Sequence, residues 1–295
     1  MMECVQQRRP VTQAVALALF VLPALYVSAI LSTAVHEILG HGFCAMLLGG
    51  EFSGFVLKWD AMGWAYSELP ESAPLSHHIF FSASGIIANL VFGGMLLGFA
   101  FIVSPKPHVQ LMLLVVSFTC LIDGISYVLW NAYHPDPSGD IGRIIWLLWS
   151  GPQPPEDLAI RWVLLVGGAL IFFATVFFFS TAVFIRVEAV VLGPDRLKGR
   201  SRVLALLLFL VLPSLVGWFS FDWNQLVPGI GLLPNMTGVL CEVTAATLLF
   251  WYRPRWTCGN SARPIPVGHI LVSWMCLTAT VLVVALWATD GVSWR

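Results

Sequence analysis

Long uninterrupted apolar runs restrict the fold of this chain more than any other feature. Each run approaches or exceeds the ~20 helical residues that cross a hydrocarbon core of about 30 Å. The runs are continuous rather than alternating, which excludes a transmembrane barrel. Seven stretches qualify: 13–48, 78–104, 109–133, 160–186, 202–221, 236–252 and 268–289. The sequence therefore predicts an all-α, polytopic protein with about seven transmembrane helices embedded in a lipid bilayer.

The composition agrees with a membrane protein and excludes other classes. Of the 295 residues, 58% are hydrophobic and 11% are charged, whereas soluble domains average about 25% charged residues. The 15 basic residues are balanced by 16 acidic residues. This absence of a cationic excess excludes a nucleic acid as partner.

The basic residues near the ends of the runs predict the orientation and a division of the chain. With the N-terminus in the cytoplasm, eleven basic residues fall in cytoplasmic segments and four in outer segments, as the positive-inside rule requires. The basic loop 187–201, together with Arg186 and Arg202 at its two ends, contributes five of the eleven cytoplasmic basic residues. We expect residues 1–186 to form a membrane core and residues 187–295 to add three further transmembrane helices.

Residues 49–77 form a different kind of segment. Glu51–Lys58 and Gly63–Glu68 alternate in part between apolar and polar residues, with a short turn between them. Alternation over such lengths is typical of paired strands. The sequence predicts a short β-hairpin at the membrane surface.

Three acidic residues lie inside apolar runs, namely Glu37, Asp123 and Glu242. Each charge placed there costs at least about 2.5–3.5 kcal/mol, so each is a functional candidate. Glu242 has no basic or histidine neighbour in its run, which favours a neutral carboxylic acid hydrogen-bonded between helices. Glu37 instead lies between two histidines in the segment His36–His41, HEILGH. Imidazole and carboxylate groups suit Zn²⁺, and a glutamate beside a ligand can act as general base.

The spacing of the two histidines requires a distorted helix. In the usual H-E-x-x-H motif the ligands lie about 40° apart around the helix axis. His36 and His41 are five residues apart, which places them about 140° apart on a regular α-helix. A π-bulge would return both to one side, and Gly40 makes such a distortion easier. The alternative is that Glu37 and His41 form the ligand pair and His36 points elsewhere.

A catalytic zinc takes three protein ligands, and two aspartates compete for the third position. Asp123 lies about ten residues, or ~15 Å, below the outer end of its helix, close to the depth of the histidines. Asp140 follows a loop that emerges on the same side, and it precedes Ile141–Trp146, the start of a short apolar helix. The depth of Asp123 in the membrane favours it as the third ligand. The residues by themselves leave both aspartates as candidates.

Four features in residues 30–146 resemble the site-2 protease family of intramembrane zinc metallopeptidases. The segment Val35–Gly50 is similar to the first helix of the family, in which a histidine-glutamate motif leads into a leucine-glycine turn. The hairpin follows, and Ser84–Asn89 is a run of small residues that ends in asparagine. Asn131–Ile144 combines an asparagine, prolines and an aspartate before Ile-Gly-Arg-Ile. The spacings His36–His41 and Asn131–Asp140 are each one residue longer than the usual form of the family.

The resemblance implies roles for individual residues. His36, His41 and Asp140 would bind Zn²⁺, Glu37 would be the general base, and Asn89 and Asn131 would support the substrate or the oxyanion. The implied reaction is hydrolysis of peptide bonds in transmembrane protein or peptide substrates, and the predicted topology places the site toward the outer face.

Two other functions compete with this hypothesis. The first is a non-catalytic relative that serves as a membrane scaffold or binding protein. The second is an ion- or proton-coupled transporter in which Glu37, Asp123 and Glu242 form a relay.

Overall fold

Among the described residues, five helices are long and apolar enough to cross a membrane. The computed structural model describes residues 10–59, 61–102, 106–133, 137–149, 159–192, 265–288 and 291–293. The candidate spans within them are Val15–Leu47, Leu75–Ile102, His108–Leu129, Ala159–Val183 and Val267–Leu286. They coincide with five predicted runs and confirm an all-α, polytopic membrane architecture. The predicted spans 202–221 and 236–252, with Glu242, lie outside the described residues.

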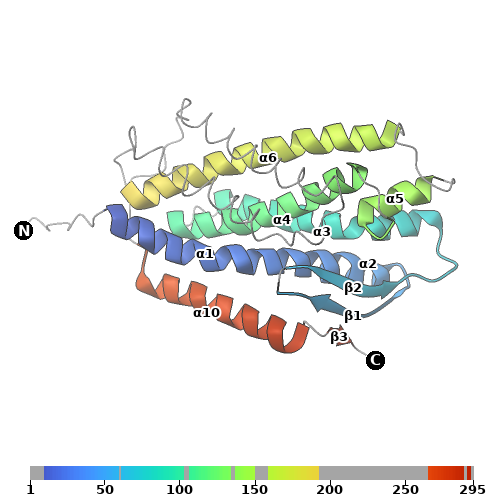
Figure 1. Cartoon of the computed structure of the whole chain (residues 1–295), viewed down its shortest axis with the longest axis horizontal. Coiled ribbons are helices and arrows are strands. Elements are labelled where there is room, and N and C mark those ends of the chain that lie inside the picture. The colour runs from blue at the N-terminus through green and yellow to red at the C-terminus, as the bar shows by residue number, and fades with distance from the viewer. Residues whose placement is uncertain are drawn as a thin grey trace, which may run out of the picture.

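The helices lie along the long axis of the molecule (Figure 1). The first span consists of α1 (Pro10–Ala34), the π-helical segment η1 (Val35–Gly42) and α2 (Phe43–Leu47) in direct succession. The other elements are α3 (Leu75–Ile102), α4 (Pro107–Tyr133), the short α5 (Asp140–Leu148), α6 (Ala159–Leu192), α10 (Val267–Val283) and the π-helical η4 (Val284–Ala288). Pro107 occupies the first position of α4, where the N–H that proline lacks would have no helical partner.

Helix α4 lies at the centre of the bundle because it packs against α1, α3 and α6. One cluster of buried side chains closes the end of the bundle near the N-terminus and consists of Leu17, Phe20, Leu111, Val187 and Ile265. These residues come from α1, α4, α6 and the segment before α10. Because lipid is as apolar as these side chains, such contacts stabilise the bundle through close packing.

The predicted hairpin is present and carries a third strand. β1 (Glu51–Leu57) pairs antiparallel with β2 (Gly63–Glu68). β3 (Val292–Ser293) pairs with the other edge of β1, so the strand order is β2-β1-β3. The sheet lies beside α2 and the C-terminal end of α10 (Figure 1). A strand of two residues has no periodic pattern, and the sequence therefore did not predict β3.

Two glycines bring α3 into close contact with η1. A side chain at Gly40 would overlap the backbone of Gly85, and a side chain at Gly85 would overlap the ring of His36. The two backbones approach closely only because both positions lack Cβ. This contact places Phe81, Ser84 and Asn89 of α3 beside the histidines of η1.

Candidate metal centre

The π-helical geometry of η1 brings His36 and His41 to the same side of the first span. All eight residues from Val35 to Gly42 are π-helical, and the two imidazole centroids lie 5.1 Å apart. The predicted π-bulge is confirmed, and the alternative in which His36 points away from His41 is wrong. The π-helical turn accommodates one residue more than an α-helical turn, so residues five apart lie on the same side as residues four apart do in H-E-x-x-H.

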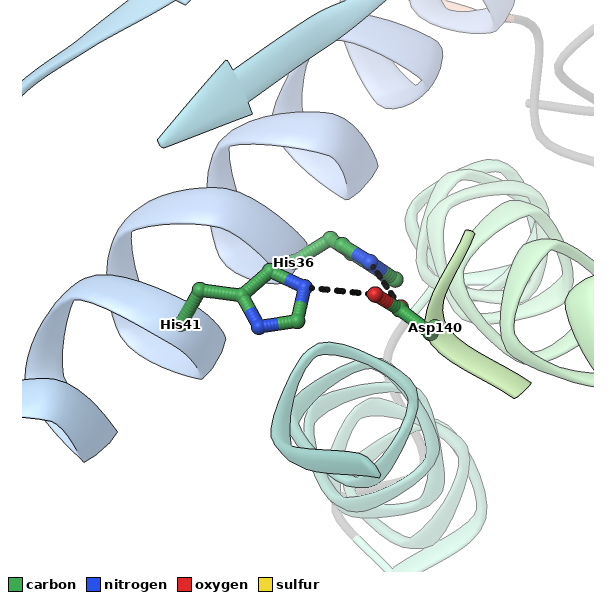
Figure 2. Close-up of side chains that lie close together, drawn as sticks. All are labelled: His36, His41 and Asp140. Atoms are coloured by element: carbon green, nitrogen blue, oxygen red, sulfur yellow. Dashed lines mark hydrogen bonds and ion pairs between the residues drawn. The ribbon is translucent and has the colours of Figure 1, made fainter. Parts of the chain in front are cut away.

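Asp140 faces both histidines from the first residue of α5 (Figure 2). Its Oδ2 lies 2.8 Å from Nε2 of His36, and its Oδ1 lies 3.1 Å from Nε2 of His41. One potential ligand atom from each of the three residues lies within 4.8 Å of the other two. Two segments that are about 100 residues apart therefore converge on one point.

The hydrogen positions on His41 and the negative charge of Asp140 favour a cation between these two residues. Nδ1 of His41 lies 3.0 Å from the Phe81 carbonyl oxygen, which can only accept, so Nδ1 carries the hydrogen. In a neutral ring, Nε2 of His41 then presents a lone pair to the carboxylate. Burial raises the pKa of Asp140, but hydrogen bonds with the two histidines and their positive charge outweigh the burial and lower it to about 2. A lone pair and a carboxylate oxygen 3.1 Å apart repel each other unless a proton or metal ion lies between them.

The donor set fits zinc. Two imidazole nitrogens and one carboxylate oxygen are the ligand types of catalytic sites that hold Zn²⁺ with three protein ligands. The Phe81 carbonyl also supplies the outer hydrogen bond that usually orients a ligating histidine. His36, His41 and Asp140 could therefore hold this ion together.

Glu37 lies next to this group and is held by the hairpin. Its side chain is only 7% exposed, and the backbone N–H of Ala65 donates to its Oε2 at 2.8 Å. Ala65 lies in β2, so the sheet orients this carboxyl group. The charge of Glu37 interacts with both histidines and with Asp140.

Asp123 does not join the three-residue group. Its Oδ2 accepts hydrogen bonds from Ser32 Oγ at 2.9 Å and from Asn89 Nδ2 at 3.0 Å. Asn89 itself is completely buried. Asn131 lies in the last turn of α4, and its side chain is outside the described part of the structure.

Two neighbours of the histidines have no signal in the sequence. The Tyr127 ring stacks on His36 with centroids 4.8 Å apart, and the Phe81 carbonyl accepts from His41. Ser84 Oγ lies 3.3 Å from the same His41 nitrogen. Ser84 lies within the small-residue run that ends at Asn89, so this motif could have indicated it. A backbone carbonyl and an aromatic residue in an apolar helix offer no such indication.

Deletion of Leu39 is expected to preserve metal binding. Leu39 is 55% exposed, so its loss removes little packing, and the deletion restores H-E-x-x-H on a regular α-helix. We expect zinc affinity within about threefold of the wild type, whereas an alanine inserted after Leu39 should weaken it more than about tenfold. Competition with a chromophoric chelator measures both. A folded deletion variant that no longer binds zinc would contradict the role assigned to the π-helix.

Comparison with known proteins agrees with this geometry. The sequence model of the Peptidase M50B-like family matches residues 11–133. No curated protein and no solved structure matches the chain. The matched region includes both histidines and Glu37 and ends shortly before Asp140. This match supports membership of the site-2 protease family.

Proposed function

We propose that this protein is an intramembrane zinc metallopeptidase that hydrolyses peptide bonds of transmembrane protein or peptide substrates. One observation carries the proposal. Two histidines from a π-helical turn and an aspartate from α5 converge in a buried site among membrane helices, with a glutamate beside them. Membership of a peptidase family supports proteolysis in general.

In this proposal the Nε2 atoms of His36 and His41 and a carboxylate oxygen of Asp140 would hold a zinc ion. When bound, zinc would supply a Lewis acid that polarises a carbonyl oxygen and lowers the pKa of water. Asp140 contributes a negative charge that offsets part of the charge of the ion.

Glu37 acts as the general base and later as the general acid. Its carboxylate removes a proton from the attacking water and then delivers that proton to the leaving amine nitrogen. Because the Ala65 N–H occupies Oε2, we assign the proton transfer to Oε1. The hydrogen bond from β2 also keeps the carboxyl group oriented toward the site.

The hairpin and α5 lie at the end of the bundle opposite the N-terminus (Figure 1). With the N-terminus in the cytoplasm, the site faces the outer side.

Residues 1–186 would form the peptidase core, and residues 187–295 would add three further transmembrane helices. Asn131, at the end of α4, would support the substrate or oxyanion.

Reconstitution with and without zinc tests the proposed function. The purified protein is placed in liposomes with a set of transmembrane peptides, and products are identified by mass spectrometry. We expect cleavage within apolar segments, loss of cleavage after chelation, and recovery when zinc is returned. A protein that binds zinc stoichiometrically but cleaves no substrate would favour the scaffold function. Ion flux that depends equally on Glu37 and Glu242 would favour the transporter.

A further inference from the structure

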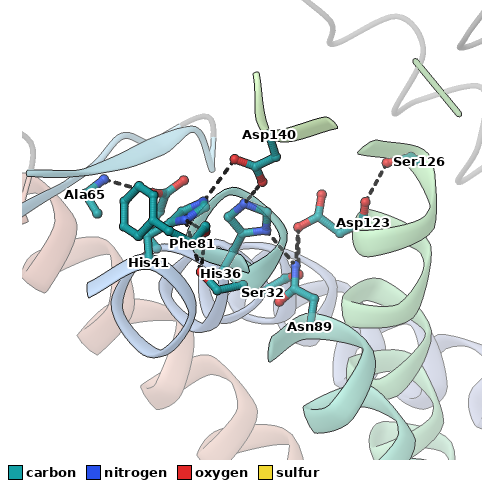
Figure 3. A network of polar contacts seen from close by, with 11 residues as sticks. Ser32, His36, His41, Ala65, Phe81, Asn89, Asp123, Ser126 and Asp140 are labelled. Atoms are coloured by element: carbon teal, nitrogen blue, oxygen red, sulfur yellow. Dashed lines mark hydrogen bonds and ion pairs between the residues drawn. The ribbon is translucent and has the colours of Figure 1, made fainter. Parts of the chain in front are cut away.

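The side of His36 that faces away from Asp140 is enclosed by two other helices. Its Nδ1 lies 3.4 Å from Nδ2 of Asn89, which belongs to α3 (Figure 3). The ring of Tyr127, from α4, stacks on the imidazole. The orientation of this ring therefore depends on residues that do not touch the proposed ion.

Asn89 is connected in turn to a buried carboxyl group. Its Nδ2 also donates to Oδ2 of Asp123 at 3.0 Å, and Ser32 Oγ donates to the same oxygen at 2.9 Å. Ser32, Asn89 and Asp123 come from α1, α3 and α4. These contacts form a chain of polar groups, Asp123–Asn89–His36, that joins three helices behind the site.

One atom of the Asp123–Asn89–His36 group has no hydrogen-bond partner among the described residues. This atom is Oδ1 of Asn89, which is buried, and an unpaired buried acceptor is costly. Rotation of the side-chain amide by 180° about the Cβ–Cγ bond exchanges the positions of Oδ1 and Nδ2 with little change in shape. Asn89 can therefore offer either a donor or an acceptor to Nδ1 of His36.

The proton on His36 decides which orientation is preferred. Without an ion, Nε2 donates to Asp140, so Nδ1 is bare and accepts from the amide nitrogen. When Nε2 binds an ion, the proton of the neutral ring is on Nδ1, which then needs an acceptor. The rotated amide would place Oδ1 there, where a protonated Asp123 would donate to the same oxygen. In the observed orientation Nδ2 has two partners and Oδ1 has none among the described residues, and rotation would exchange these roles.

We propose that Asn89 and Asp123 are positioning residues that hold the His36 ring with Nε2 toward the metal ion. Asn89 accepts the Nδ1–H of His36, and Asp123 acts through Asn89. This inference rests on the proposed zinc site and assigns Asn89 a role that differs from support of the oxyanion. Its complete burial agrees with this role.

Zinc affinity in matched variants tests the proposal. Asn89→Leu has nearly the same size but no polar atoms, and we expect it to weaken zinc binding about 10–100-fold. Asp123→Leu should weaken binding about tenfold, whereas Asp123→Asn, whose amide N–H can donate to Asn89, should stay within about threefold. Ser117→Ala is the control because it removes a buried hydrogen bond between α4 and α3, to the Gly93 carbonyl, and should leave zinc affinity unchanged.

Chelator competition gives the zinc affinities, and thermal unfolding of the metal-free proteins identifies general damage. If Asn89→Leu does not fold, the smaller Asn89→Ser replaces it, and the two Asp123 variants provide a separate comparison. The inference is wrong if folded Asn89 variants bind zinc as the wild type does. Equal losses in Asp123→Asn and Asp123→Leu would contradict the hydrogen-bonding role of Asp123. A wild-type protein that binds no zinc would instead contradict the proposed function itself.

Discussion

The Glu37→Gln variant is expected to lose peptide hydrolysis and to retain zinc. Glutamine keeps the size of the side chain and an oxygen that can accept the Ala65 N–H, but it cannot take a proton from water. General acid–base catalysis contributes about 10²–10⁴-fold, so we expect the turnover number to fall by about a thousandfold. Cleavage of a transmembrane peptide in liposomes measures the turnover number, and metal analysis measures the zinc content.

An exposed glutamate of the same hairpin provides the control for Glu37. Glu68 lies at the end of β2 and is exposed, so Glu68→Gln changes the charge without touching the metal centre and should leave turnover unchanged. If Glu37→Gln retains both turnover and zinc, Glu37 is not the general base. If the variant retains the full biological function without cleavage, the protein acts as a non-catalytic scaffold.

The Asp140→Ala variant is expected to lose zinc. The substitution removes one of the three proposed ligands and the only carboxylate that contacts both His36 and His41 among the described residues. Two imidazoles alone should bind the ion more than about 100-fold more weakly, because loss of an outer-sphere partner by itself costs up to about 100-fold. Zinc at 100 times its Kd stabilises a folded protein by about 2.7 kcal/mol. The wild type should therefore show a zinc-dependent rise in Tm that the variant lacks.

Asp123→Asn distinguishes the two candidates for the third ligand. Asp123 contacts Ser32 and Asn89 rather than the pair of histidines, so this variant should retain the zinc-dependent rise in Tm. The opposite pattern, in which Asp140→Ala binds zinc and Asp123→Asn does not, would show that Asp123 is the third ligand. It would also contradict the positioning role proposed above.

Local patterns in the sequence were sufficient to predict the described spans, the β1–β2 hairpin and the π-helical turn. Apolar runs of about 20 residues predicted five of the helices because the thickness of the bilayer sets their length. Alternation predicted β1 and β2. The five-residue spacing of His36 and His41 predicted the π-helix, because no regular α-helix places both on one side. These inferences depend on distances of a few residues along the chain.

The tertiary structure decided which aspartate meets the histidines. The rise per residue gives the depth of Asp123 along its helix, and depth alone favoured that residue. The direction of a side chain around the helix axis depends instead on how neighbouring helices are rotated and how closely they pack. Here Gly40 and Gly85 permit α3 to lie directly against η1, so Asn89 occupies the space between Asp123 and His36.

The sequence by itself therefore determined a polytopic membrane protein with two histidines and a glutamate in one distorted turn. The tertiary structure showed that Asp140, which the sequence offered beside Asp123, is the aspartate that contacts the histidines, and it alone supplied the hydrogen bond from Ala65 to Glu37 and the strand β3. Each of these contacts joins residues that are far apart in the chain. Their formation depends on helix packing and strand pairing, which leave no periodic signal in the residues that take part.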